Sequence, residues 1–443
     1  MCAFSTTRYK MPVPEKNPVV RGRRCRYTTT AHNDDRDKTR SKTKRGEMLQ
    51  SVLVPILKVL RLFVPRNGTV IVMPNTGAGS FGDQAMMDVA TNQVASRGYI
   101  PVIFEVPGEL YHLRTQVRSL VLGKGKLTQF AQILWALARA EGIALIAADV
   151  INDKYHGTRR RLDVVDTGAR VGMPAALLGY SLTDNPGPVS TSQLRNLSPG
   201  VTSYLRDRLS HERYVSLTGK QAPLVADIAF MLAPETDTSV GRATLEQIAT
   251  WKSEGCMVLG VNVGGPTIAA MKDDGVPAYT RLLTRWLEAD PARRIVLVPH
   301  DTKPKPHGDL PYAEELMEVL APQFGDRIHM MRPPFNTWEI KQVAGALDAV
   351  LTARMHFAIA CLGMGTPPLC VAYLGKFEGL MEHFDLPDVL VEPEDVPNTE
   401  VMFDHLSRFI ALNTDLRTRI AQAWPQVKSL SRQNFDWLPK RKD

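Results

Sequence analysis

The chain has 443 residues, of which 44% are hydrophobic and 23% charged, so it is long enough for two domains and has the composition of a soluble globular protein. Its formal charge of +8 would fit a nucleic-acid-binding protein, but residues 1–47 hold 13 Lys and Arg against five Asp and Glu and account for the whole excess. The rest of the chain is neutral, which excludes a general basic field, and we expect no nucleic-acid partner. An anion site in the folded part must therefore be built locally.

Residues 1–47 are polar, with few large apolar side chains and with basic runs at 21–24 and 42–45. Such a segment cannot bury enough surface to offset the entropy of ordering, so we predict a disordered basic tail. It lacks the apolar core of a signal peptide, and the five cysteines of the chain show no CxxC pairing, which together favour a cytoplasmic protein with reduced thiols. Because Met48 opens the structured part, a translation start at that residue is an alternative.

An apolar stretch, MLQSVLVPILKVLRLFV, covers residues 48–64. It is too short and too interrupted, by Pro55, Lys58 and Arg61, to span a bilayer. Two interpretations remain open. The first is a helix packed on the first domain, and the second is an interfacial helix that makes peripheral contact with a membrane.

Short strand-like apolar runs then alternate with helical patterns, which is typical of parallel sheets built from βαβ units. In the first half, strands are predicted at residues 70–73, 101–104, 143–148, 175–178 and 214–217, and helices at 84–97 and 127–141. We expect residues 48–234 to form an N-terminal Rossmann-like domain.

A break near residues 232–235 precedes a second series of strands, predicted at 257–263, 295–298, 349–352 and 369–372. Residues 235–398 are expected to form a C-terminal Rossmann-like domain, and residues 399–443 a helical segment that crosses back onto the first domain. The predicted fold class is α/β, with two Rossmann-like domains facing a cleft. Because ligands of open parallel sheets lie beyond the carboxyl ends of the strands, the residues after each strand are the candidates for a site.

The first predicted strand ends in PNTGAGSFGD, residues 74–83, directly before a helix. Small residues let backbone N–H groups approach an anion, and the helix N-terminus adds a favourable dipole, so Asn75 and Gly82 are predicted to bind substrate. Asp83 is either the N-cap of that helix or a general base whose carboxylate points into the cleft. The loop is neither a GxGxxG nor a Walker A motif.

Three further candidates stand near predicted strands. Asp149 ends the run IALIAAD, where it either caps the next turn or contacts a substrate hydroxyl. Arg206, on the approach to the predicted 214–217 strand, is either an ordinary surface arginine or an anion ligand. His300 ends the run IVLVPH and either packs in the core or faces the cleft.

The strongest local signal is TARMHFAIACLGMGTP, residues 352–367. Arg354 and His356 lie two residues apart at the start of an otherwise apolar helix, and charged groups at a buried strand-to-helix junction need partners. Both side chains can reach a phosphate or a carboxylate. The spacing therefore predicts an anion site on the second domain.

The order of these pieces resembles the polysaccharide pyruvyl transferase family over roughly residues 69–390. The matching pieces are the loop from Asn75 to Gly82 and Asp83, the strand ending at Asp149, Arg206-Asp207, Asp227-Ile-Ala-Phe230, Val261-Asn-Val263, Pro299-His300, Glu339-Ile-Lys341, Arg354-x-His356, and Gly365-x-Pro367 followed by Tyr373 and Lys376. One departure is the pair Ala147-Ala148 before Asp149, where many members carry a Gly-Gly-rich turn. Two methyl groups there would narrow the loop and alter the choice of acceptor.

The resemblance implies a GT-B-like fold, phosphoenolpyruvate as donor, and a sugar of a polysaccharide or a lipid-linked glycan as acceptor. The N-terminal domain would hold the acceptor and the C-terminal domain the donor. Arg206, Arg354 and His356 would hold the donor and assist catalysis. Asp83 would act as base toward the acceptor, although the acid and base roles of His356 and Asp83 can be interchanged.

The remaining predicted cleft residues, which the resemblance implies as substrate contacts, are Asp149, His300, Glu339 and Lys376. Outside the tail the chain has no Asp-x-Asp, HExxH or G-x-S-x-G motif, so we expect a metal-independent reaction without a cofactor. Two alternatives remain: a nucleotide-sugar glycosyltransferase of GT-B type, with Arg354 and His356 on a diphosphate, and a non-catalytic glycan-binding relative. Nucleic-acid binding by the tail is disfavoured by the neutral body.

Overall fold

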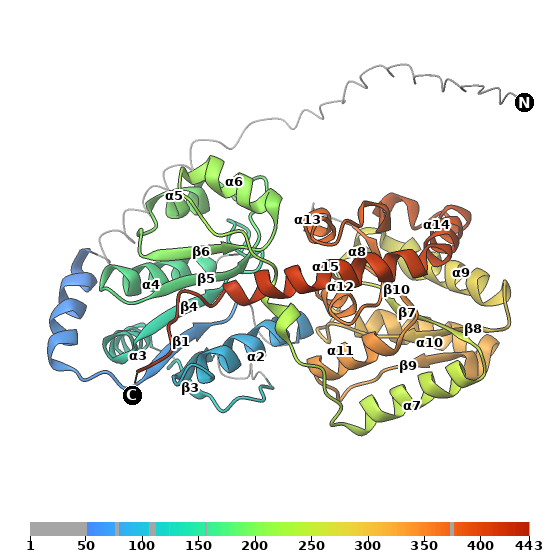
Figure 1. Ribbon diagram of the computed structural model, residues 1–443, viewed down its shortest axis with the longest axis horizontal. Coiled ribbons are helices and arrows are strands. Elements are labelled where there is room, and N and C mark those ends of the chain that lie inside the picture. Colours follow the sequence, from blue (N-terminus) through green and yellow to red (C-terminus); the bar gives the residue numbers. More distant parts are fainter. Residues whose placement is uncertain are drawn as a thin grey trace, which may run out of the picture. The chain divides into compact units, whose positions relative to one another are not determined.

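A helix over residues 51–63, here termed the leading helix, begins the described part of the computed structural model, which comprises residues 51–75, 79–105, 112–123, 125–155, 157–372 and 376–442 (Figure 1). The predicted disordered tail, residues 1–47, lies outside this part, as do residues 48–50 and Tyr373. Among the described helices, none has the length and apolarity needed to cross a membrane.

The first half of the chain forms a six-stranded sheet in which every neighbouring pair is parallel. Its strands are β1 (Thr69–Met73), β2 (Ile100–Glu105), β3 (Arg118–Val121), β4 (Gly142–Ile146), β5 (Ala175–Tyr180) and β6 (Val201–Leu205). Its helices are α2 (Phe81–Ala95), α3 (Lys126–Arg139), α4 (Thr158–Arg170), α5 (Pro188–Asn196) and α6 (Arg208–Thr218). Alternate residues of β1 enter two separate hydrophobic clusters, one against α2 and one against α3 and α4. The strand is therefore buried on both faces, which explains its continuous apolar run.

The second half repeats this arrangement with a second parallel sheet. Its strands are β7 (Met257–Asn262), β8 (Arg293–Leu297), β9 (Ile328–Met330), β10 (Ala349–Thr352), β11 (Pro368–Val371) and β12 (Leu390–Val391). Its helices are α7 (Ser239–Ser253), α8 (Gly265–Ala270), α9 (Gly275–Glu288), α10 (Leu310–Phe324), α11 (Thr337–Ala346), α12 (Met355–Leu362) and α13 (Lys376–Glu382).

Both sheets have the strand order of a Rossmann fold. The first runs β3-β2-β1-β4-β5-β6, and the second, read from its far edge, runs β9-β8-β7-β10-β11-β12. The order reverses between β1 and β4 in one sheet and between β7 and β10 in the other. Ligands bind beyond the carboxyl ends of the strands at such switch points. The segments that follow β1, β4 and β10, with Asp83 in the first turn of α2, Asp149 in the loop after β4 and His356 in the first turn of α12, therefore lie where a ligand is expected.

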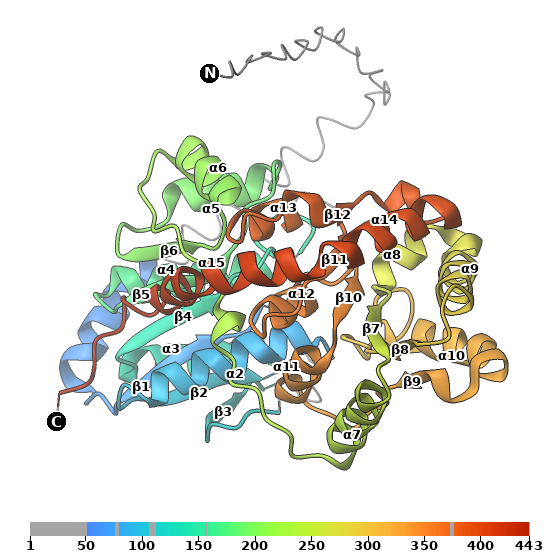
Figure 2. The same ribbon diagram turned by 45° about the vertical axis from the view of Figure 1, so that its right-hand side comes forward.

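Two C-terminal helices, α14 (Thr399–Ala411) and α15 (Asn413–Gln433), follow the second sheet. Helix α15 runs from the second sheet back toward the first (Figures 1 and 2). Just after it, the side chain of Asn434 accepts from the Gly179 N–H at 2.9 Å and donates to the Ala226 carbonyl at 2.8 Å. The predicted return of the C-terminal segment to the first half is thus confirmed.

The predicted strand at 214–217 is wrong, because these residues belong to α6. Asp207 caps the start of that helix by accepting from the Ser210 N–H at 2.7 Å, and Gly219 ends it with a φ of 70°. Its buried residues, Ser210 and Tyr214, are four apart, which is a helical period. The strand of this region is β6, whose sequence VTSYL is too polar to stand out as an apolar run, and the sequence predicts none of the short strands β3, β9 and β12 either.

Candidate active site

Two helix N-termini, those of α2 and α12, meet between the two sheets. His356, the second residue of α12, lies so close to Gly82, the second residue of α2, that a methyl group on this glycine would clash with the imidazole. Free N–H groups and the aligned peptide dipoles make each helix N-terminus locally positive. The meeting of two such ends favours an anion beside His356.

Asp83 lies on the third residue of α2, and Ser80, not Asp83, is the N-cap. The alternative in which Asp83 caps the helix is therefore wrong. Its carboxylate instead accepts from the side-chain amide of Asn75 at 2.7 Å, so the two predicted site residues of this loop contact each other. Both side chains are buried, as is the Asn75 Oδ1, which has no hydrogen-bond partner in the described structure.

Arg206, which directly follows β6, is buried beside a carboxylate that the site prediction left out. Its Nη1 donates to Asp227 Oδ2 at 2.7 Å and its Nε donates to Ser181 Oγ at 2.6 Å. The side chains of Arg206 and Asp227 are 4% and 2% exposed, so the pair is shielded from water. Burial by itself would raise the pKa of Asp227, but His356 and Arg206 hold it well below its usual range.

The imidazole of His356 faces the same carboxylate. Its Nε2 lies 3.7 Å from Asp227 Oδ2, too far for a hydrogen bond, and has no hydrogen-bond partner in the described part of the chain. A buried ring nitrogen without a partner is unfavourable unless a ligand supplies one. Asp227 is placed to stabilise the protonated imidazole when a proton arrives.

Arg354 is also paired with a buried carboxylate. Its Nε and Nη2 donate to Asp309 Oδ1 at 2.8 and 2.6 Å, and its Nη2 also donates to the His307 carbonyl. Asp309 accepts in addition from the Gly265 N–H at 2.7 Å and the His300 N–H at 3.1 Å, so it is held rigidly. The two arginines that the family resemblance assigns to the donor are thus each oriented and partly neutralised by an aspartate.

Asp149 and Lys376, which were predicted to bind substrate, form an ion pair with each other. Asp149 follows β4 and Lys376 begins α13, so the pair links the two halves at the carboxyl ends of their strands. Burial would raise the pKa of Asp149, but Lys376, Arg206 and His356 lower it. This dependence shows that Asp149 shares its electrostatic surroundings with the candidate site.

A sequence model of the polysaccharide pyruvyl transferase family, compared with this chain, matches residues 81–375. The match covers more than half of the chain, from the start of α2 to the loop before α13, so that β1 precedes it and β12 follows it. The chain belongs to the polysaccharide pyruvyl transferase family. The matched range includes five of the residues just described, namely Asp83, Arg206, Asp227, Arg354 and His356.

Solved structures with the same architecture are GT-B enzymes, and the predicted fold class is confirmed. The UDP-GlcNAc 2-epimerase from Neisseria meningitidis aligns with 85% of this chain and 99% of its own at a TM-score of 0.56 and 9% identity. A glycosyltransferase from Rickettsia africae aligns with 83% of this chain and 97% of its own at a TM-score of 0.50 and 11% identity. At these identities the likeness concerns the fold alone.

Two residues of the pyruvyl transferase motifs that were predicted to face the cleft lie in the core instead. The His300 ring packs between Phe81 and Phe357, with centroids 6.1 and 5.8 Å away, and is 4% exposed. Burial first, and then the neighbouring His356 and Arg354 side chains, lower the pKa of His300 well below its ordinary value, so the His300 ring is neutral. It is placed to pack and not to hold an anion.

Glu339 is fully buried and closes the N-terminus of α11 by accepting from the Asn336 N–H at 2.8 Å. Its other oxygen accepts from the N–H and the hydroxyl of Thr238 at 2.7 and 2.6 Å, at the start of α7. All of these contacts are structural, so the prediction that Glu339 binds substrate is wrong. An acid three residues after an Asn is the pattern of a capping box, and that signal was present in the sequence.

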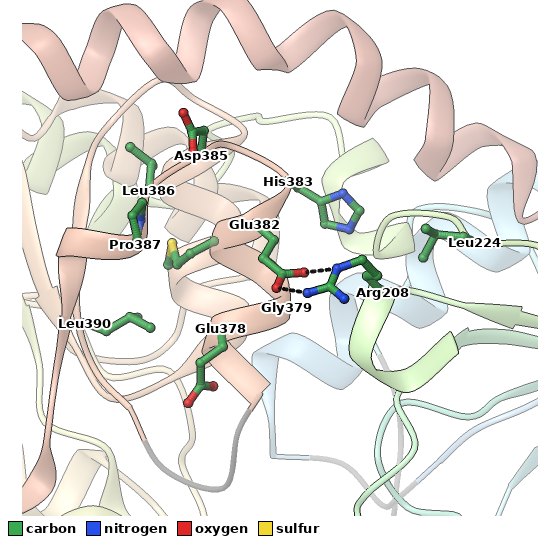
Figure 3. Close-up of a pocket in the computed structure, with 11 residues that line it drawn as sticks. Arg208, Leu224, Glu378, Gly379, Glu382, His383, Asp385, Leu386, Pro387 and Leu390 are labelled. Atoms are coloured by element: carbon green, nitrogen blue, oxygen red, sulfur yellow. Dashed lines mark hydrogen bonds and ion pairs between the residues drawn. The ribbon is translucent and has the colours of Figure 1, made fainter. Parts of the chain in front are cut away.

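A cavity of about 560 Å³ lies next to this site, between α6 and α13 (Figure 3). In its lining, Arg208 of α6 pairs with Glu382 of α13, with N–O distances of 2.7 and 3.2 Å. His383, also in its wall, contacts the Arg206 carbonyl at 2.9 Å. The cavity is lined by Arg208, Leu224, Glu378, Gly379, Met381, Glu382, His383, Asp385, Leu386, Pro387 and Leu390, and none of these was predicted as a site residue.

Among the described residues, no three His, Cys, Asp or Glu side chains are grouped as metal ligands would be. The metal-independent reaction expected from the sequence remains a prediction.

Proposed function

We propose that this protein transfers a pyruvyl group from phosphoenolpyruvate to two hydroxyls of one sugar in a polysaccharide or glycan precursor, where it forms a ketal. Membership in the pyruvyl transferase family supports the class of reaction. The observation that carries the assignment to this site is the buried His356 Nε2, which lacks a hydrogen-bond partner in the described structure. The His356 imidazole lies beside the N-terminus of α2 and faces Asp227. A polar ligand is needed to satisfy that nitrogen.

Phosphoenolpyruvate presents a phosphate and a carboxylate, and the site offers directed donors for both. The N-termini of α2 and α12 contribute dipoles, and Arg206 and Arg354 contribute guanidinium groups whose orientation is set by Asp227 and Asp309. Because these aspartates cancel much of the arginine charge, we assign donor recognition to the geometry of the N–H groups more than to net charge. Arg354 and α12 would hold the donor from the side of the second sheet, and Arg206 and α2 would hold it from the side of the first.

The reaction needs a proton on one carbon and the removal of protons from two hydroxyls. Protonation of the donor methylene makes the neighbouring carbon cation-like, a sugar hydroxyl attacks that carbon, and the C–O bond to phosphate breaks. The second hydroxyl closes the ring, and the two hydroxyl protons end on the new methyl group and on phosphate. We assign His356 to protonation of the donor or of the departing phosphate and Asp83 to the removal of a hydroxyl proton, and the two roles can be exchanged.

The position of Asp227, which the sequence alone did not reveal, supports the assignment of proton transfer to His356. A carboxylate 3.7 Å from Nε2 stabilises the imidazolium that delivers the proton, while Arg206 keeps that carboxylate ionised. Asp149 and Lys376, paired across the two halves, would be separated or reoriented by an acceptor hydroxyl that binds between them. The acceptor would thus lie on the side of the first sheet.

The direct test incubates the purified full-length protein with phosphoenolpyruvate and candidate glycans, and measures phosphate release together with the mass of the glycan. We expect phosphate release that depends on glycan, and a mass gain of one pyruvate ketal. His356→Gln should lower the rate by about 10²- to 10⁴-fold, the usual contribution of a general acid. His405→Gln, on the partly exposed face of α14, is the matched control and should leave the rate unchanged.

Two results would overturn the proposal. The first is turnover of a nucleotide sugar with none of phosphoenolpyruvate, which would support the GT-B glycosyltransferase alternative. The second is glycan binding without turnover of any donor, with binding unchanged in Arg354→Ala, which would support a non-catalytic relative.

A further inference from the structure

The leading helix is held to the first domain by one side only. Leu57 is fully buried, and Arg61 donates through Nη1 to the carbonyls of Leu137 and Ala140 at 2.6 and 2.9 Å, at the end of α3. These contacts fix which face of the leading helix points away from the protein.

The outward face of this helix is apolar too. Val52, Ile56, Val59 and Phe63 are 57%, 44%, 55% and 81% exposed, and their spacing of four, three and four residues places them along one side of the helix, opposite Leu57. Leu62, beside this row, is 79% exposed. A helix that covers a soluble domain normally has a charged outer face, so an apolar row of this length indicates a surface with a partner.

The neighbouring helix α3 also carries exposed apolar side chains. Leu127 and Trp135 are 86% and 53% exposed and lie eight residues apart, on one side of α3 together with Ala131 between them. Arg139 lies over the Trp135 ring, with its guanidinium carbon 5.5 Å from the ring centroid. Trp with Arg is a combination suited to the boundary between water and an apolar phase.

The surroundings of the apolar row are basic. Lys58 and Arg66 are exposed on and just after the leading helix, and residues 1–47, immediately before it in the chain, carry the whole net charge of +8. A partner that matches both features must be apolar and negatively charged. We propose that the leading helix and α3 bind the surface of an anionic lipid bilayer, with the apolar row at the acyl boundary and the basic groups at the headgroups.

Two other occupants fit these features less well. A second copy of the chain would bring two segments of charge +8 together, which repel each other. The segment 1–47 itself has few large apolar side chains with which to cover the row. The anionic bilayer satisfies the apolar and the charge requirement together, and it does so independently of the reaction proposed above.

The test is sedimentation of the full-length protein with phosphatidylcholine vesicles, with and without phosphatidylglycerol. We expect binding only to the phosphatidylglycerol vesicles, weakened by salt. Phe63→Glu should reduce binding about tenfold or more, because it removes a large exposed apolar group and adds a negative charge. Val319→Glu, at a 44% exposed position on α10, is the matched control and should bind as the wild type does.

Because both positions are exposed, each variant is expected to fold, and phosphate release with a soluble acceptor should be the same in both. Equal binding to both vesicle types would refute the preference for anionic lipid. Equal loss of vesicle binding in Phe63→Glu and Val319→Glu would refute the assignment of binding to the leading helix. A wild-type dimer in solution that Phe63→Glu converts to a monomer, without vesicle binding, would assign the row to a second copy. The tryptophan fluorescence of the wild type should shift when anionic vesicles are added. Loss of this shift in Trp135→Phe would support contact between α3 and the bilayer.

Discussion

Replacing Gly82 with alanine probes a close contact between the two halves. Gly82 lies within α2, so its backbone suits any residue, and the three heavy atoms nearest to an added methyl all belong to His356. The substitution therefore acts on one neighbour, the imidazole that we assign to proton transfer.

The expected change in stability has two opposing parts. Forcing an extra methyl into a packed contact costs about 1–3 kcal/mol, while alanine in place of glycine in a helix gains up to about 1 kcal/mol. The single variant Gly82→Ala should thus lose about 0–2 kcal/mol in the free energy of unfolding. In a His356→Ala background the clash is absent, so the same substitution should stabilise the protein by about 0.5–1 kcal/mol.

Urea denaturation of the four proteins measures this coupling, and glycan-dependent phosphate release measures its effect on activity. Displacement of the ring by about 1 Å should lower the rate roughly 10²-fold in Gly82→Ala, and the second substitution should change nothing further in His356→Ala. Gly200→Ala is the control, because the atoms nearest to its added methyl lie at ordinary van der Waals distance. If Gly82→Ala changed stability by the same amount in both backgrounds, the inferred contact with His356 would be refuted.

Three further predictions concern charged side chains that are buried or partly buried. Asp227→Asn leaves Arg206 without its carboxylate and should cost about 3–5 kcal/mol in urea denaturation. The pKa of Asp227 is lower in the folded protein than in the unfolded chain, so the ionised carboxylate stabilises the fold above the unfolded-state pKa of about 3.9. This stabilisation is lost as the pH falls through the folded-state pKa. The free energy of unfolding should therefore fall more in acid for the wild type than for Asp227→Asn. Lys376→Met breaks a partly exposed pair with Asp149 and should cost about 1 kcal/mol, well below the Asp227 value, with a larger effect on KM for the glycan. Burial, with Lys428 and Arg114 nearby, lowers the pKa of Lys341 to about 7. Between that pH and about 10 the side chain is protonated in the unfolded chain and neutral in the folded protein, so the free energy of unfolding should rise with pH across this range. In Lys341→Met this rise should be smaller.

The paired arginines change how donor binding is expected to respond to salt. If Arg206 and Arg354 met the donor as bare cations, affinity for phosphoenolpyruvate would fall steeply with ionic strength. Each is instead held by a buried or nearly buried aspartate, Asp227 or Asp309, and short-range directed hydrogen bonds are screened much less by salt. Removal of either aspartate would also free its arginine to move, so under the proposed function we expect donor affinity to depend on residues that need not touch the donor.

The sequence by itself determined the fold class and the ends of the strongly apolar strands. Apolar runs that recur with helical stretches between them specify parallel strands buried on both faces, and the residues that follow those runs must gather at one edge of each sheet. Asp83, Asp149 and His356 were located in this way. Strands that are short or half polar, such as β6, carry too weak a pattern to be found from the sequence.

The tertiary structure alone decided which charged groups meet. Asp227 follows β6 across a helix and a loop, and only the packing of η1 (Ile228–Met231) against α12 brings it to His356. The Asn-x-x-Glu pattern before α11 indicates that Glu339 closes a helix start, but only its burial and its contacts in the folded chain decide that it does not also face a ligand. Pairing between residues far apart in the chain depends on how the two sheets are placed, and side-chain burial, which determines the charge state, exists only once they are packed.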